Sequence, residues 1–214
     1  MSPDGEAGAR ALPEGALRLV YIVDATSATD AGRLDAALAG GVGTVWLRAP
    51  GVDGATLYRV ARDLRRRTRD HGACLLIGDR ADVALACDAD GVQLGFRSPP
   101  LARIRPWFPR AIGVSCHSQR DLERAALGHA DHAVLSPVFG VPTKGEPLGL
   151  PQFQRWVAAC PLPVVGLGGI GPQEGAGVRA AGAAGVAVIR ALRDAEDPAA
   201  AARALLAPAL LAGE

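Results

Sequence analysis

The sequence has no apolar run long enough to cross a membrane and no excess of basic charge. No stretch approaches the roughly 20 apolar residues that span a bilayer, and the first residues are Gly, Ala and acid rather than a basic start followed by a hydrophobic run. The net charge of the 214 residues is +1, with acids and bases mixed along the chain. These absences predict a cytoplasmic protein that binds neither nucleic acid nor membranes.

The cysteines lack the spacing of a metal site or a disulfide framework. The four of them, Cys74, Cys87, Cys116 and Cys160, lie far apart, and no CxxC or Cys/His zinc pattern is present. We therefore expect reduced, mostly buried thiols and no metal site built from cysteine.

What the sequence does contain is a repeated alternation of short β-branched runs with Ala/Leu/Arg segments, which is typical of βα units around a parallel sheet. A chain of this length with 49% hydrophobic residues can bury one sizeable core. We predict an α/β protein with a single (β/α)8 TIM barrel over residues 17–214, preceded by a flexible leader, residues 1–16. The expected strands are Leu19–Val23, Val42–Leu47, Cys74–Ile77, Gly91–Leu94, Ala111–Ser115, Ala133–Leu135, Pro163–Leu167 and Val186–Ile189, and the helices begin at about Ala28, Asp53, Arg80, Pro100, Gln119, Pro151, Gln173 and Asp197.

An open, doubly wound sheet is the main structural alternative, because Gly166-x-Gly168-x-x-Gly171 satisfies the dinucleotide pattern GxGxxG. The match lies near the C-terminal end, and Pro172 follows its last glycine. About 20 residues on stands Arg190 rather than the acid that binds a ribose. The barrel is therefore the better interpretation.

Two segments near the C-terminus predict a phosphate site. Val164–Ile170 is an apolar run that stops at Gly168 and Gly169, and a second buried-type run ends at Arg190. Glycines let backbone N–H groups approach a phosphate, and in a (β/α)8 barrel such a site typically follows strands seven and eight.

In a barrel, chemistry is done at the C-terminal ends of the strands. Strand two ends at Arg48, which suits an anion, and His117 follows strand five. The long connection Pro137–Gly149, an expected active-site loop, carries Thr143 and Lys144. Further candidates are Asp79, Gln93, Ser115 and Ser136 at strand ends and Tyr21 in the interior of the first strand.

Several motifs in this order resemble the thiamine phosphate synthase and TenI superfamily over about residues 18 to 195. They are Trp46-Leu-Arg48, Gly78-Asp-Arg-Ala-Asp-Val-Ala-Leu, Asp90-Gly-Val-Gln-Leu-Gly95, Ile112-Gly-Val-Ser-Cys-His-Ser118, Pro142-Thr-Lys144 and Val164-Val-Gly-Leu-Gly-Gly-Ile. The resemblance implies a (β/α)8 barrel that handles a thiazole phosphate. It also implies a homodimer.

The chain departs from the synthase pattern at the positions that serve pyrophosphate and magnesium. Synthases of this superfamily usually follow the strand-two Leu-Arg with an acid and a lysine, where this chain has Ala49-Pro50. They usually carry Asn-Asp after strand three and Gln-Asp-Asp after strand four, where it has Gly78-Asp79 and Phe96-Arg97-Ser98. Without a metal, departure of a pyrophosphate is hard.

These departures favour a TenI-type thiazole tautomerase that needs no cofactor or metal. By resemblance, His117 moves the proton that makes a thiazole carboxylate phosphate aromatic, and Gly168, Gly169 and Arg190 bind the phosphate. Histidine suits proton transfer because its ordinary pKa is about 6.5.

Two alternatives stay open. One is a thiamine phosphate synthase, which joins a hydroxymethylpyrimidine pyrophosphate to the thiazole phosphate and depends on magnesium. The other is a catalytically silent barrel that binds a thiazole or thiamine phosphate.

Overall fold

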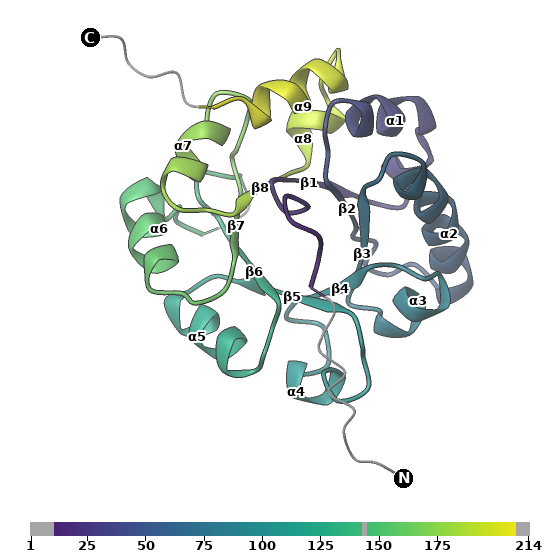
Figure 1. Ribbon diagram of the computed structural model, residues 1–214, viewed down its shortest axis with the longest axis horizontal. Helices are drawn as coiled ribbons and strands as arrows, with labels where there is room; N and C mark the ends of the chain where they lie inside the picture. Colours follow the sequence, from purple (N-terminus) through teal and green to yellow (C-terminus); the bar gives the residue numbers. More distant parts are fainter. Residues whose placement is uncertain (1–10, 143–144, 209–214) are drawn as a thin grey trace.

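The computed structural model describes residues 11–142 and 145–208 and shows a closed barrel of eight parallel strands (Figure 1). Each strand pairs with the next along the chain, and β8 pairs with β1. The strands are β1 (Leu19–Val23), β2 (Thr44–Leu47), β3 (Cys74–Gly78), β4 (Gly91–Leu94), β5 (Ala111–Cys116), β6 (His132–Leu135), β7 (Val164–Leu167) and β8 (Gly185–Val188). The predicted fold class is confirmed.

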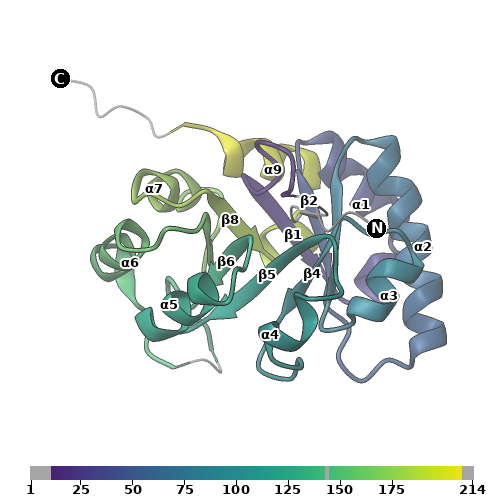
Figure 2. The same ribbon diagram turned by 60° about the horizontal axis from the view of Figure 1, so that its bottom comes forward.

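Helices surround the ring of strands on its outer side (Figure 2). They are α1 (Ala31–Ala39), α2 (Gly54–Asp70), α3 (Ala81–Ala86), α4 (Leu101–Ile104), α5 (Gln119–Leu127), α6 (Gly149–Ala158), α7 (Gly175–Ala180), α8 (Arg190–Arg193) and α9 (Pro198–Leu206), with the 3-10 turn η1 (Ser27–Thr29) before α1. The short helix α8, directly after β8, was not predicted. Among the described residues, no helix combines the length and apolar character of a membrane span.

Side-chain caps explain where several helices begin. Asp53, Ser118 and Asp197 each accept a hydrogen bond from the backbone N–H three residues later, at the starts of α2, α5 and α9. Such a cap satisfies an N–H that has no partner within the helix and contributes about 1 kcal/mol.

The strands bury both faces, but the two faces differ in what they contact. Val20, Ile22, Trp46 and Leu76 belong to a small cluster inside the barrel, whereas the alternate residues of β1 belong to the larger core between the strands and the helices. Tyr21 is one of these alternate residues. It therefore packs outside the barrel, and burial raises its pKa to about 12.

The chain just before β1 covers the N-terminal end of the barrel. Leu12 and Leu17 pack against the cluster inside the barrel, and the Thr44 hydroxyl donates a 2.8 Å hydrogen bond to the carbonyl of Ala16. In Figure 1 this purple segment crosses the opening of the ring. Residues 11–16 of the expected leader thus contact the barrel, and residues 1–10 lie outside the described residues.

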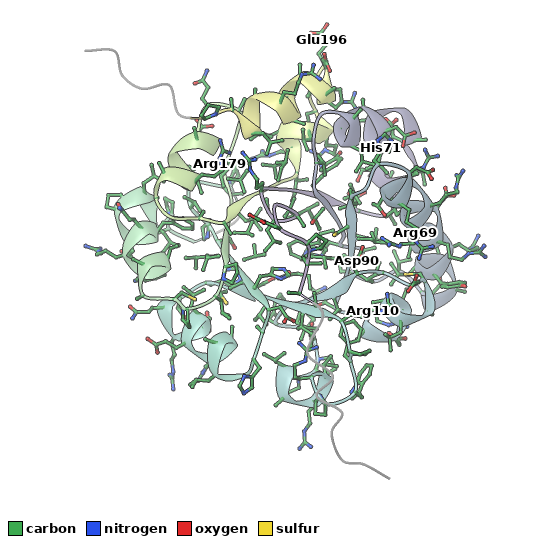
Figure 3. All side chains as sticks on the ribbon, in the orientation of Figure 1. Arg69, His71, Asp90, Arg110, Arg179 and Glu196 are labelled. Carbon is green, nitrogen blue, oxygen red and sulfur yellow. The ribbon has the colours of Figure 1, made fainter. Side chains whose placement is uncertain are left out.

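Ion pairs tie α2 to the turns before β4 and β5. Arg69 and Arg110 both pair with Asp88, and Arg65 pairs with Asp90 at 2.6 Å. Figure 3 shows Arg69, Asp90 and Arg110 on the α2 and α3 side of the molecule. The dense basic charge of α2 thus has structural partners, each worth about 1 kcal/mol or less where it is exposed.

Candidate active site

Two adjoining pockets open at the C-terminal ends of the strands, and Leu167 and Ile189 line both. The first has a volume of about 550 Å³ and is lined by Gly168, Gly169, Gly171 and Arg190, among others; we call it the glycine cup. The second, of about 260 Å³, contains Arg48, Arg97 and His117, and we call it the arginine pocket. Both lie where barrel enzymes carry their chemistry.

The glycine cup owes its shape to two residues with left-handed backbone. Gly168 has φ +107° and Gly169 φ +65°, and a Cβ on Gly168 would lie 2.9 Å from Cα of Pro137. The loop after β7 therefore packs backbone to backbone against the loop after β6. This close packing leaves a wall without side chains, which suits a phosphate group.

Charged side chains rim the cup. Arg190 is the first residue of α8 and lines the cup. Glu174 and Asp194 line the cup too. The Glu174 carboxylate accepts a 2.9 Å hydrogen bond from the N–H of Gly171, so one cup N–H already has an anionic partner. Sequence reasoning missed Glu174, because Gly171-Pro-Gln-Glu174 does not match a helix-capping pattern.

The arginine pocket places two cations in one concavity. Arg48 and Arg97 both line it, and neither forms an ion pair with a described residue. Trp46 contributes its ring from inside the barrel, and Phe96 at the rim is 86% exposed. Two guanidinium groups without carboxylate partners suit an anion.

His117 is oriented by the next strand. Its Nδ1 lies 2.8 Å from the carbonyl oxygen of Ser136 and 3.3 Å from the Ser136 hydroxyl, and its backbone N–H donates to Asp121. A carbonyl can only accept, so Nδ1 carries the hydrogen in the neutral ring, and Nε2 keeps its lone pair. His117 lines the arginine pocket, where this nitrogen can take up a proton.

The residues around Asp79 do not form a magnesium site from protein side chains alone. One carboxylate oxygen of Asp79 accepts hydrogen bonds from the Gly95 N–H at 3.0 Å and from the Ser98 hydroxyl at 2.5 Å. The described residues contain no group of three or more His, Cys, Asp or Glu side chains that could hold a metal, so Asp79 is a single carboxylate, which holds magnesium only together with substrate phosphates. The same pocket carries Arg48 and Arg97 instead.

The other candidate residues divide between the mouth and the interior. Ser115 and Ser136 line the arginine pocket. Gln93 is 1% exposed and lies one layer deeper, where it donates a 3.2 Å hydrogen bond to the Ser115 hydroxyl. Tyr21 lies outside the mouth, because it points to the helices. Thr143 and Lys144 lie outside the described residues.

Sequence reasoning also missed Trp46 and Ile189 as mouth residues. Trp46 stands two positions before Arg48 on the same strand, and side chains two apart on a strand share a face. This alternation was the available signal.

A comparison with protein families matches residues 19–192 to the family described as thiamine monophosphate synthase. Among curated relatives, the putative thiamine-phosphate synthase of Geobacter sulfurreducens is 44% identical over 81% of this chain and 84% of the relative. The thiamine-phosphate synthase of Moorella thermoacetica is 40% identical over 79% of this chain and 83% of the relative.

A solved structure gives the same result. The thiamine phosphate pyrophosphorylase from Pyrococcus furiosus is 32% identical and superposes with a TM-score of 0.83 over 90% of this chain and 95% of that one. The superfamily predicted from the sequence is therefore confirmed. The relatives, however, are named thiamine-phosphate synthase and not TenI-type tautomerase.

Proposed function

Since this chain belongs to the thiamine monophosphate synthase family, we propose that it is a thiamine-phosphate synthase, which joins a hydroxymethylpyrimidine pyrophosphate to a thiazole phosphate. One observation carries the proposal beyond the names of the relatives. The glycine cup and the arginine pocket adjoin at Leu167 and Ile189. Two adjoining anion sites suit two phosphorylated substrates that must meet.

In this proposal the thiazole phosphate lies with its phosphate in the glycine cup, and the pyrophosphate lies against Arg48 and Arg97. The thiazole nitrogen attacks the methylene carbon of the pyrimidine, and the carbon–oxygen bond to pyrophosphate breaks. The nitrogen uses its own lone pair, so no proton has to be removed. Holding both substrates in this geometry supplies much of the rate enhancement.

The leaving group carries several negative charges, which must be neutralised as it departs. Asp79 and Ser98 do not hold a metal by themselves, and we assign this task to the guanidinium groups of Arg48 and Arg97. Guanidinium forks match phosphate oxygens in pairs.

A second candidate, the thiazole tautomerase, is favoured by the orientation of His117. The synthase reaction has no use for a base, yet the 2.8 Å contact between Nδ1 and the Ser136 carbonyl leaves Nε2 able to accept a proton. One side chain could then remove a proton from the non-aromatic thiazole carboxylate phosphate and return it elsewhere. This proton transfer needs no metal.

Two assays on one protein preparation separate the candidates. The first measures thiamine phosphate formed from the two synthase substrates, and the second measures the ultraviolet change as the non-aromatic thiazole carboxylate phosphate becomes aromatic. Coupling supports the synthase, and aromatisation without coupling supports the tautomerase. Thermal stabilisation by thiamine phosphate with no turnover in either assay would support a barrel that binds this ligand without catalysing a reaction.

A further inference from the structure

Three residues form one row across neighbouring strands beneath the arginine pocket. In the strand register, Gln93 of β4 is opposite Gly113 of β5, and Gly113 is opposite His132 of β6. Gln93 and His132 are each 1% exposed. A Cβ on Gly113 would overlap both the Gln93 amide oxygen and His132 Nε2. The absence of a side chain at Gly113 is therefore what lets the two polar groups meet inside the barrel.

Each hydrogen bond in this row has a defined donor and a defined acceptor. His132 Nε2 lies 3.1 Å from Oε1 of Gln93, and Nε2 of Gln93 donates to the Ser115 hydroxyl oxygen at 3.2 Å. An amide oxygen can only accept, so His132 Nε2 carries a hydrogen. An amide nitrogen can only donate, so the Ser115 oxygen accepts. The proton of the Ser115 hydroxyl then has to point elsewhere.

Burial keeps His132 in the form that this arrangement requires. Desolvation lowers the pKa of His132 to about 4, against the smaller opposite effect of Asp131. At neutral pH the ring is uncharged and has a single N–H, which the Gln93 contact places on Nε2.

Ser115 connects the row to the mouth. It lies two positions after Gly113 on β5, so it faces the same side, and it lines the arginine pocket. Arg48 and Arg97 in that pocket favour an anionic group. A hydroxyl whose oxygen already accepts from Gln93 can donate its proton to such a group.

We propose that His132 and Gln93 are positioning residues, which hold the Ser115 hydroxyl as a hydrogen-bond donor to an anionic oxygen of the ligand in the arginine pocket. The inference rests on the proposed function, in which that oxygen belongs to pyrophosphate. Without the His132 contact, the Gln93 amide can flip, so that its oxygen accepts a hydrogen bond from the Ser115 hydroxyl. The hydroxyl proton would then point away from the ligand.

The test measures the binding of inorganic pyrophosphate by calorimetry to protein saturated with thiazole phosphate. Ser115→Ala removes the donor, and His132→Phe removes the group that orients it while keeping a ring of similar size. Each variant should weaken pyrophosphate binding about tenfold, the effect of one lost hydrogen bond to a charged group. The double variant should bind pyrophosphate as Ser115→Ala does, because His132 acts only through Ser115.

Thiazole phosphate binding in the glycine cup is the control and should be the same in all variants. A merely structural role of His132 would weaken both ligands and would add to the effect of Ser115→Ala, which would overturn the inference. Equal pyrophosphate affinity in wild type and a folded His132→Phe would also overturn it. A wild type that binds thiazole phosphate but no pyrophosphate would instead refute the proposed function, and the inference with it.

Gln93→Glu provides a second route if His132→Phe does not fold. The new carboxylate has nearly the shape of the amide, but both of its oxygens accept, so the Ser115 hydroxyl would donate to it. Pyrophosphate binding should again fall about tenfold in the wild-type background and should not fall further in Ser115→Ala. A loss of the same size in both backgrounds would contradict the proposal.

Discussion

The Nδ1 atom of His117 lies 2.8 Å from the carbonyl oxygen of Ser136, which joins the end of β5 to the end of β6. The contact fixes which ring nitrogen carries the hydrogen, and so which one can accept a proton. The contact lies in the arginine pocket. It matters for only one of the two candidate reactions, because the tautomerase uses a base and the synthase does not.

His117→Asn should distinguish the two reactions in one protein. Asparagine can still donate to the Ser136 carbonyl but cannot act as a base near neutral pH. Any aromatisation should fall by about 10²–10⁴-fold, while thiamine phosphate formation should change only a few-fold. His71→Asn, at the C-terminal end of α2 (Figure 3), is the matched control. Loss of coupling in His117→Asn but not in the control would place His117 in the synthase reaction.

Ser98→Asp should create a magnesium site that the wild type lacks. The Ser98 hydroxyl donates to Asp79 at 2.5 Å, so the substitution puts a second carboxylate beside the first. Without metal the like charges should repel and lower the melting temperature, and millimolar magnesium should restore it. The wild type should show no such shift.

Ser98→Ala removes the same hydrogen bond without adding charge and serves as the control. It should be destabilised by about 1 kcal/mol, with no response to magnesium. A wild type stabilised by magnesium as strongly as Ser98→Asp would refute our interpretation of the Asp79 donor set.

The alternation of strand and helix patterns predicted the fold. It did not show which side chains of each strand point into the barrel and which point to the helices. Leu19–Val23 is apolar at every position, so nothing in the run shows that Tyr21 points to the helices and Ile22 into the barrel. The strands were found to within two residues. Helix α8 was missed because its four residues directly follow β8 and carry no cap of their own.

Single residues at strand ends can be predicted from the sequence, whereas a contact between residues far apart in the chain cannot. Arg48, His117, Gly168 and Arg190 follow from strand-end position alone and line the two pockets. The contact between Gln93 and His132 joins residues 39 apart in sequence. It depends on the register of three strands and on the missing side chain of Gly113, which no local pattern contains.

His132 should make the protein less stable between pH 6.5 and 4. Burial lowers its pKa from 6.5 to about 4, so in this range the unfolded chain binds a proton that the folded chain does not. The free energy of unfolding should fall as the pH falls through this range, by up to about 3 kcal/mol. Urea unfolding at a series of pH values measures this.

His132→Phe lacks the titrating group and should show a shallower pH dependence over the same range. The aspartates whose pKa is lowered, such as Asp24 and Asp88, lose their contribution only below about pH 4. Equal slopes in wild type and His132→Phe would mean that His132 binds protons alike in both states.

Cys116 should resist alkylation in the folded protein, although it neighbours His117. Burial, together with the charge of Asp121, raises its pKa to about 12, and burial raises that of Cys74 to about 11. The thiolate is the reactive form, so iodoacetamide at pH 8 should modify the partly exposed Cys160 first. Mass spectrometry of digested peptides measures the order. Modification of Cys116 ahead of Cys160 would contradict the buried position of this thiol.

In the proposed function, the two pockets hold the two substrates of thiamine phosphate synthesis. The most direct measurement is thiamine phosphate formation by purified protein supplied with hydroxymethylpyrimidine pyrophosphate, thiazole phosphate and magnesium chloride. We expect steady product formation, which the double variant Arg48→Ala, Arg97→Ala reduces strongly while thiazole phosphate binding persists. No product from the wild type, with rapid aromatisation of the thiazole carboxylate phosphate by the same preparation, would contradict the proposed function and establish the tautomerase.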